Sequence, residues 1–242
     1  MKVMKTLAGI VPLILLLGCS NPADNVPAAT VKSATNATGK VSDSGGRYFV
    51  FGPDSATIEF IGSKITGSHH GGFRNFAGEF RVVNGQLADS GNKIVIEMSS
   101  IWADNDRVTG HLKSPDFFNV PQLPTATFVS TAVAQKTGDS TVTGNLTLHG
   151  VTKQISFPAR IQAGADAVDV TAEFVLNRFD FDIKYPGKAN DLIRKEVVLK
   201  LKVKAAPGRA KFASVEQPEQ TAVASAQTAG APGGKQRGGM TR

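Results

Sequence analysis

The stretch DAVDVTAEFVL, residues 166–176, alternates apolar and polar side chains with a period of two. Apolar residues stand at every second position from Val168 to Leu176, and the positions between them begin with Asp169, Thr171 and Glu173. Successive side chains of a β-strand point to opposite faces. The pattern therefore predicts a strand with one buried face and one face in water.

The same alternation recurs along the chain, and turn signals such as Asn-Gly and His-Gly separate the repeats. It is clear in residues 196–204, 143–150 and 154–161, and it is weaker in residues 76–82 and 93–99. Further strands are expected at residues 47–52, 56–64 and 125–134. About eight or nine antiparallel strands predict an all-β sandwich or a closed barrel. The only helical candidate is short, at residues 103–114.

Composition and charge limit the function classes. The chain has 242 residues, 41% of them hydrophobic and 19% charged, enough for a sizeable core. Of the net charge of +7, Lys2 and Lys5 supply two and residues 207–242 supply 5 − 2 = +3, which leaves +2 for all other residues. Because the middle of the chain is nearly neutral, we expect no nucleic-acid binding.

The N-terminus predicts a secreted, lipid-anchored protein. Two lysines precede a short apolar run that Pro12 interrupts, which is typical of a signal peptide over residues 1–18. The sequence LLGC ending at Cys19 resembles the bacterial lipobox, so Cys19 is the expected lipidation site. A buried or catalytic cysteine is the alternative, but a signal segment is not part of the fold. Ser20 favours the outer membrane over the inner one, facing the periplasm.

The composition divides the remainder into three parts. Residues 19–45 are small and polar and predict a flexible tether behind the lipidated cysteine. Residues 46–206 carry the strand pattern and form the expected β-barrel domain. Residues 207–242 predict a disordered basic tail, with contact to anionic surfaces as the alternative.

No motif indicates catalysis or a metal site. His69 and His70 are neighbours, and neighbours on a strand point to opposite faces, so we expect rim or loop histidines and no metal. The segment starting at Asp104 begins like a calcium loop but has Val108 at a ligand position. No GxSxG nucleophile elbow is present, so we expect no enzyme and no cofactor.

Four long blocks resemble the YceI-like family. They are DNDRVTGHLKSPDFFNVPQLPTATFVST (104–131), VTGNLTLHGVTKQISFPA (142–159), FVLNRFDFDI (174–183) and DLIRKEVVLKLKV (191–203). The resemblance implies an eight-stranded, lipocalin-like antiparallel barrel that binds a long isoprenoid chain in its interior, outside the cytoplasm. Residues 63–80 and Asp182, which stands where a Gly is common, depart from the family pattern and are expected in rim loops.

The expected ligand contacts follow from the barrel and the resemblance. The interior and lid residues are Phe60, Phe76, Phe80, Trp102, Phe117, Phe118, Phe128, Leu146, Phe157 and Phe174, and the rim residues for a head group are His69, His111 and Arg178. Arg178 has an alternative role in an ion pair with Asp180 or Asp182, and Trp102 and Phe181 have an alternative role in the core. Gly78 and Gly144 on inward faces favour an open interior.

The segment SPDFF, residues 114–118, carries two adjacent phenylalanines in a proline-rich stretch. A turn there allows both rings to lean over one end of the barrel, so we predict a lid in which one ring plugs the end and the other packs on the rim. The alternative is that both rings complete the core.

Two function classes remain. The first is an isoprenoid-binding protein whose partners are the lipid and, through Cys19, the membrane. The second is a stress-response or structural envelope lipoprotein whose barrel is filled by its own side chains. A homodimer is left open in both.

Overall fold

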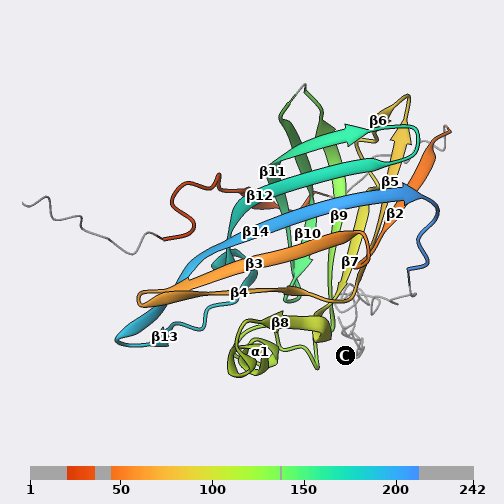
Figure 1. Ribbon diagram of the computed structural model, residues 1–242. Helices are drawn as coiled ribbons and strands as arrows, with labels where there is room; N and C mark the ends of the chain where they lie inside the picture. The colour runs from red at the N-terminus through yellow and green to blue at the C-terminus, as the bar shows by residue number, and fades with distance from the viewer. Residues whose placement is uncertain (1–20, 36–44, 137, 213–242) are drawn as a thin grey trace, which may run out of the picture. The chain divides into compact units, whose positions relative to one another are not determined.

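The structure is a computed structural model, and it describes residues 21–35, 45–136 and 138–212 (Figure 1). The strands are β1 (Thr30–Ser33), β2 (Arg47–Phe51), β3 (Ala56–Lys64), β4 (Gly67–Phe73), β5 (Phe76–Val83), β6 (Gln86–Leu87), β7 (Lys93–Glu97), β8 (Ile101–Ala103), β9 (Thr125–Ala134), β10 (Ser140–Leu148), β11 (Val151–Ala163), β12 (Val168–Asn177), β13 (Gly187–Lys188) and β14 (Asp191–Pro207). The helices are α1 (Asp106–Lys113) and the short 3₁₀ turns η1 (Met98–Ser100) and η2 (Arg178–Phe181). The described chain is therefore mostly β, as expected.

Eight strands close into an antiparallel barrel. The ring runs β2–β5–β7–β9–β10–β11–β12–β14, and the end of β14 pairs with β2 through Ala206↔Val50 to complete it. The predicted eight-stranded, lipocalin-like barrel is confirmed, and the sandwich is excluded. Because closure leaves no free edge in this ring, every strand has two neighbours.

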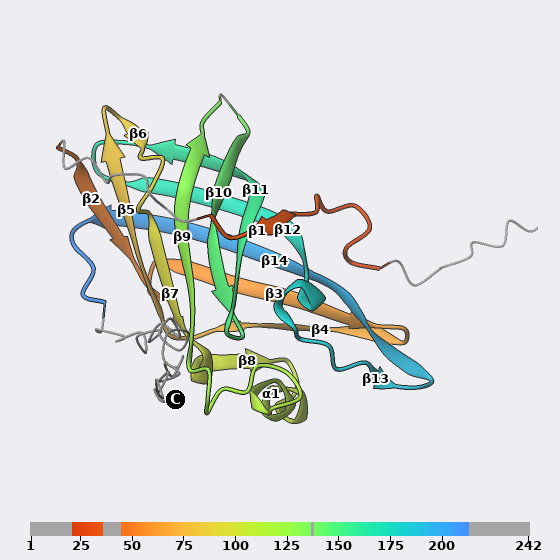
Figure 2. The same ribbon diagram turned by 180° about the vertical axis from the view of Figure 1, so that it is seen from behind.

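Three further strands form a second wall beside the barrel ring. In the chain, β3 follows β2, β4 precedes β5, and β8 follows β7 after the turn η1. The three strands pair in the order β3–β4–β8, which matches the order β2–β5–β7 in the ring. The second wall joins the barrel along β14, which pairs with β3 over most of its length. In Figures 1 and 2 the β3–β4 hairpin and β13 extend to one end of the molecule, away from the β11–β12 turn.

The core is formed by the inward faces of the alternating strands. The strand β12 places Val168, Val170 and Phe174 in the core, while Thr171 and Glu173 face water. The same face of β14 buries Val203 and Ala205. The period of two in the sequence therefore predicted both the strands and their buried side.

The helix α1 confirms the helical candidate at residues 103–114. Asn105 caps its first turn, because its side-chain oxygen accepts from the N–H groups of Arg107 and Val108. The helix ends at Lys113, and its C-cap Ser114 directly precedes Pro115, which cannot continue it.

Within residues 63–80, where we expected a rim loop, residues 67–73 form a strand. Residues 67–73 form β4, which pairs with β3 from Lys64↔Gly67 to Glu59↔Gly72. The sequence GSHHGGF has three glycines and no apolar alternation, so its strand character comes from pairing with β3 and β8. Asp182 lies where η2 ends and has φ of +57°, the left-handed conformation that glycine adopts most easily.

The N-terminal segment is part of the barrel wall. β1 pairs with β11 from Thr30↔Ser156 to Ser33↔Lys153, and Ala28 bridges Val175 of β12. It thus lies between β11 and β12 where those strands diverge, since their own pairing covers only residues 160–163 and 168–171. The expectation of a flexible tether over residues 19–45 is wrong for residues 21–35, whose small polar sequence hid a strand that needs partners far along the chain.

Candidate functional site

One end of the barrel is hollow. A cavity of about 540 Å³ lies between β3, β14, α1 and the residues after α1, and apolar side chains form most of its wall. The apolar lining consists of Ile58, Phe60, Phe73, Ile96, Val108, Leu112, Phe117, Phe118, Ala126, Leu146, Leu148, Leu176, Ile183, Ile193, Val197 and Leu199. Pockets for small molecules are typically about 300–1,000 Å³ and mostly apolar. The cavity therefore has the size and the lining of a binding site for an apolar ligand.

The other end of the barrel is filled by its own side chains. A void of about 40 Å³ lies there, beside Phe80, Phe128 and Phe157. The rings of Phe157 and Phe174 stack at 4.2 Å between centroids, which closes the space between β11 and β12. The interior is thus neither a continuous tunnel nor a continuous core.

The expected contact residues divide between these two ends. Those that line the cavity are Phe60, Phe117, Phe118, Leu146, His69, His111 and Arg178. Those that do not are Phe76, Phe80, Trp102, Phe128, Phe157 and Phe174. The latter five phenylalanines are in or against the filled core, whereas Trp102 lies half-exposed beneath the guanidinium of Arg74 at 5.3 Å. Phe181 is fully buried in the core, in line with the alternative that we left open.

The two adjacent phenylalanines both face the cavity. Phe117 is buried, and its ring lies 4.9 Å from that of His111 and 5.4 Å from that of Tyr185. Phe118 is half-buried and packs against the cluster of Met98, Val120 and Ala126 as well as the main core. A turn after α1 brings both rings to the same side, as the sequence predicted for a segment that is not a strand.

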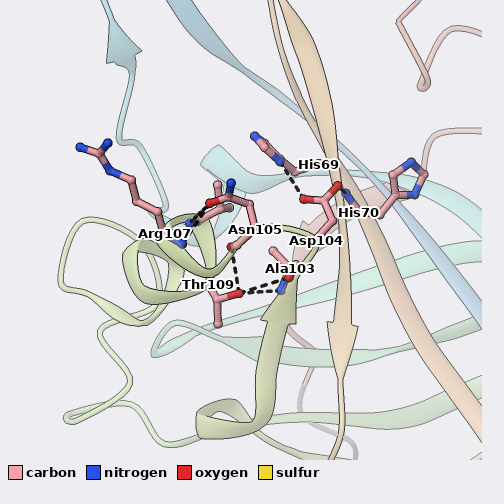
Figure 3. A network of polar contacts seen from close by, with 8 residues as sticks. His69, His70, Ala103, Asp104, Asn105, Arg107 and Thr109 are labelled. Atoms are coloured by element: carbon pink, nitrogen blue, oxygen red, sulfur yellow. Dashed lines mark hydrogen bonds and ion pairs between the residues drawn. The ribbon is translucent and has the colours of Figure 1, made fainter.

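His69 belongs to a polar network between β4 and α1 (Figure 3). Its Nδ1 lies 2.8 Å from Oδ1 of Asp104, and Oδ2 of the same carboxylate accepts from the N–H of His70 at 3.0 Å. The bonds from His70 and His69 hold the pKa of Asp104 below its usual value. Thr109 adds a link, because its hydroxyl accepts from the N–H of Ala103. The network fixes the first turn of α1 against β4, with His69 at the cavity wall.

His111 is the second cavity histidine and lies in α1. Its Nε2 lies 2.8 Å from Oδ2 of Asp116, and its ring meets those of Phe117 and Tyr185 edge-on. Both cavity histidines are therefore oriented by a carboxylate. Among the described residues no group of three or more His, Cys, Asp and Glu side chains is placed to hold a metal ion.

Arg178 organises the rim through backbone carbonyls. Its Nε donates to the oxygen of Arg194 at 3.0 Å, and its terminal nitrogens donate to those of Ile183, Tyr185 and Ile193 at 2.5–3.2 Å. The ion pair with Asp180 or Asp182 is not what holds it, since Asp182 pairs with Lys184 instead. Burial lowers the pKa of Arg178 from its ordinary value.

The basic rim of the cavity was not predicted from the sequence. The lining includes four further basic side chains, Lys64 of β3, Arg107 of α1, Lys188 of β13 and Arg194 of β14, together with the carboxylate of Asp191. Lys64 and Asp191 form an ion pair that joins β3 to β14. No local pattern marks these residues, because they come from β3, α1, β13 and β14 and only the fold brings them to one opening.

The glycine argument for an open interior is wrong. At Gly78 a Cβ would stand 1.9 Å from the ring of Phe51, and at Gly144 it would stand 2.4 Å from the ring of Phe128. Aromatic rings thus occupy the space that these glycines leave, as aromatic side chains do over glycines in many sheets. Gly62 is different, because it lines the cavity and a Cβ there would meet nothing within 4 Å.

Cys19 and the basic tail beyond residue 212 lie outside the described residues, so their expected roles stay predictions. Within the described ranges no helix combines the length and the apolar character that crossing a bilayer requires.

Comparison with known proteins identifies the fold family. The model of the YceI-like domain matches residues 49–205, which overlap every strand of the barrel ring. The chain belongs to the YceI-like family. Its relatives include UPF0312 proteins of Pseudomonas putida, 36% identical over 132 residues, and of Pseudomonas fluorescens, 33% identical over 138 residues. These alignments cover 51% and 54% of this chain and 68% and 71% of the relatives.

Two solved structures of this fold resemble the barrel. BcnA of Burkholderia cenocepacia aligns with a TM-score of 0.56 and 20% identity over 62% of this chain and 96% of its own. A polyisoprenoid-binding domain from Saccharophagus degradans, implicated in plant cell wall breakdown, aligns with a TM-score of 0.54 and 17% identity over 68% of this chain and 100% of its own. At these identities the likeness establishes the YceI-like fold.

Proposed function

We propose that this protein binds the hydrocarbon chain of an isoprenoid-type lipid, of the polyprenyl or quinone type, in the cavity at the hollow end of its barrel. The observation that carries the proposal is the cavity of about 540 Å³ with its nearly continuous apolar wall. An empty apolar space of this size is unfavourable for a core, since each lost contact weakens the fold. The polyisoprenoid-binding domain of the same fold supports this choice of ligand.

The rim of the cavity suits the polar end of such a lipid. His69 and His111 stand at the wall with one ring nitrogen each held by a carboxylate, and Lys188 and Arg194 line the same cavity. Arg178 has a different role from the one we expected, because it already donates four hydrogen bonds to carbonyl groups. Its task is to hold the rim in shape.

The protein acts outside the cytoplasm and is held at the outer membrane by an acylated Cys19. The support is the sequence alone: a charged start, a short apolar run and the lipobox-like LLGC. Cys19→Ser should abolish acylation and leave uncleaved precursor. Metabolic labelling with a fatty acid would overturn this part of the proposal if the serine variant were still marked.

The proposal is tested by native mass spectrometry of the purified protein, followed by organic extraction and mass analysis of what leaves it. We expect a lipid whose mass fits repeating isoprene units. A protein that carries nothing, and that binds neither polyprenyl nor quinone lipids when these are added, would favour the structural lipoprotein with a barrel that needs no ligand.

A further inference from the structure

Among the described residues, the two most exposed large apolar side chains lie next to residues that line the cavity. Ile65, with 53% of its surface exposed, lies in the turn between β3 and β4, and Leu192, with 46% exposed, lies at the start of β14. The N–H of Ile65 donates to the carbonyl of Leu192 at 3.2 Å, so the two residues are neighbours. The two hairpin ends thus form one protruding apolar point.

Basic side chains surround this point. Residues 61–67 and 182–195, which we call the basic tip, contain Lys64, Lys184, Lys188, Arg194 and Lys195 against Asp182 and Asp191, a balance of 5 − 2 = +3. Residues 46–206 as a whole have 18 basic and 16 acidic residues, or +2, so the remainder of this domain is at 2 − 3 = −1. The positive charge of the barrel domain is concentrated at the tip.

The described chain also begins at this end. The side-chain oxygen of Asn21 accepts a hydrogen bond at 3.3 Å from the hydroxyl of Ser63, which lines the cavity beside Lys64. Cys19 precedes Asn21 by two residues, and two residues of chain span no more than about 7 Å. A membrane attachment at Cys19 would therefore start from the tip and not from the opposite end of the barrel.

We propose that the basic tip is a docking surface for an anionic lipid bilayer, with Ile65 and Leu192 entering the interface and the lysines contacting the head groups. Exposed apolar side chains within a basic surface are the combination that binds at such interfaces. Because Lys64, Lys188, Asp191 and Arg194 also line the cavity, docking turns its opening towards the bilayer. Transfer of a lipid between bilayer and cavity rests on the proposed function, whereas docking itself does not.

The test places a fluorophore at each end of the barrel. Cys19 is the only cysteine of the chain, so a protein produced from residue 19 onward, without the apolar signal segment and with Cys19→Ser, allows a single polarity-sensitive label at Ile65→Cys or, as the control, at Ala165→Cys. Ala165 is exposed in the turn after β11, and this turn precedes Val168, which pairs with Ala205 at the far end of β14. A change in the emission of one label shows which end of the barrel enters the bilayer.

Vesicles of equal parts phosphatidylethanolamine and phosphatidylglycerol should shift the emission of the label at residue 65 to the blue and leave the label at 165 unchanged. Each basic side chain near an anionic surface strengthens binding about fivefold. The double variant Lys188→Gln, Lys195→Gln should therefore need about 20 to 30 times more lipid for the same response. The matched double variant Lys202→Gln, Lys204→Gln has the same charge but changes exposed lysines near the far end of β14.

Three outcomes would overturn docking through the tip. The first is an equal loss of response in the two double variants, which would indicate binding by overall charge. The second is a response of the label at 165 and none at 65. The third is a blue shift at 65 that depends on protein concentration and needs no vesicles, which would assign the tip to contact with a second copy of the chain.

Discussion

The ring of Phe60 occupies the space that a side chain at Gly71 would need. The two residues are direct partners in the β3–β4 register, and the Cζ atom of Phe60 lies 2.3 Å from where the Cβ of residue 71 would stand. The carbonyl oxygen of Trp102 is equally close on the other side. Gly71 therefore allows a large ring to form part of the cavity wall without filling the cavity.

This contact predicts the effect of Gly71→Ala. The added methyl group must displace the Phe60 ring or the β8 backbone, and overpacking of this kind costs about 1 to 3 kcal/mol of folding free energy. Denaturant unfolding would measure it. Gly67→Ala is the matched control, because its Cβ would meet nothing within 4 Å and should change stability little. Equal stability of both variants would mean that the ring moves freely.

Gly62→Leu should block the ligand without harming the fold. Gly62 lies in the cavity wall with open space above it, so the new side chain extends into the volume that the lipid would take. We expect less co-purified isoprenoid lipid by mass spectrometry and an unchanged or higher thermal midpoint. Gly110→Leu on α1 is the control, since that position is also open but does not line the cavity. Undiminished lipid in Gly62→Leu would show that the ligand lies elsewhere.

Phe117 and Phe118 should differ in what they stabilise. Phe117 is buried against His111 and Tyr185, so Phe117→Ala should cost about 3 to 5 kcal/mol of folding free energy with or without lipid. Phe118 is half-buried at the cavity, so Phe118→Ala should cost clearly less and should speed lipid release. Denaturant melts of delipidated protein beside a release assay would separate the two. A large stability loss in Phe118→Ala with unchanged release would assign both rings to the core and exclude the lid.

Arg178→Lys should weaken the rim although it keeps the charge. A lysine cannot reach the four carbonyl groups that the guanidinium fork serves, and hydrogen bonds to charged groups contribute about 1.5 to 3 kcal/mol each. We expect a loss of about 3 kcal/mol of folding free energy and faster hydrogen exchange in residues 183–194. Arg194→Lys changes a neighbouring arginine of the same rim and serves as the comparison. Similar small losses in both would mean that Arg178 acts by charge alone.

The pair of Lys64 and Asp191 predicts a dependence on pH. The hydrogen bond from Lys64 holds the pKa of Asp191 below its usual value. The folded state therefore favours the carboxylate, and its contribution to stability is present above the ordinary pKa of about 3.9. It is lost as the pH falls through the lower pKa of the folded state. The difference in thermal midpoint between the natural protein and Asp191→Asn should accordingly shrink as the pH falls below about 4, and a constant difference would contradict this.

The residues themselves show why some features could be predicted. The alternation in β12 and β14 is local, and it predicted the strands and their buried faces because each side chain's direction follows from its own position. The resemblance to the YceI-like family, which the match over residues 49–205 confirms, then selected the barrel. The sequence named contact residues at both ends of the barrel, but it did not distinguish those that line the cavity from those that fill the other end.

What the sequence determined by itself is therefore the strands of the barrel ring, the face that the clearly alternating ones bury, the short helix and the family. Only the tertiary structure decided that β4 is a strand, that residues 21–35 fill the seam between β11 and β12, and that one half of the barrel is hollow. The physical reason is that these features depend on pairs distant in the chain. Phe128 fills the space over Gly144, whereas nothing fills the space over Gly62, and neither fact is encoded near the glycine concerned.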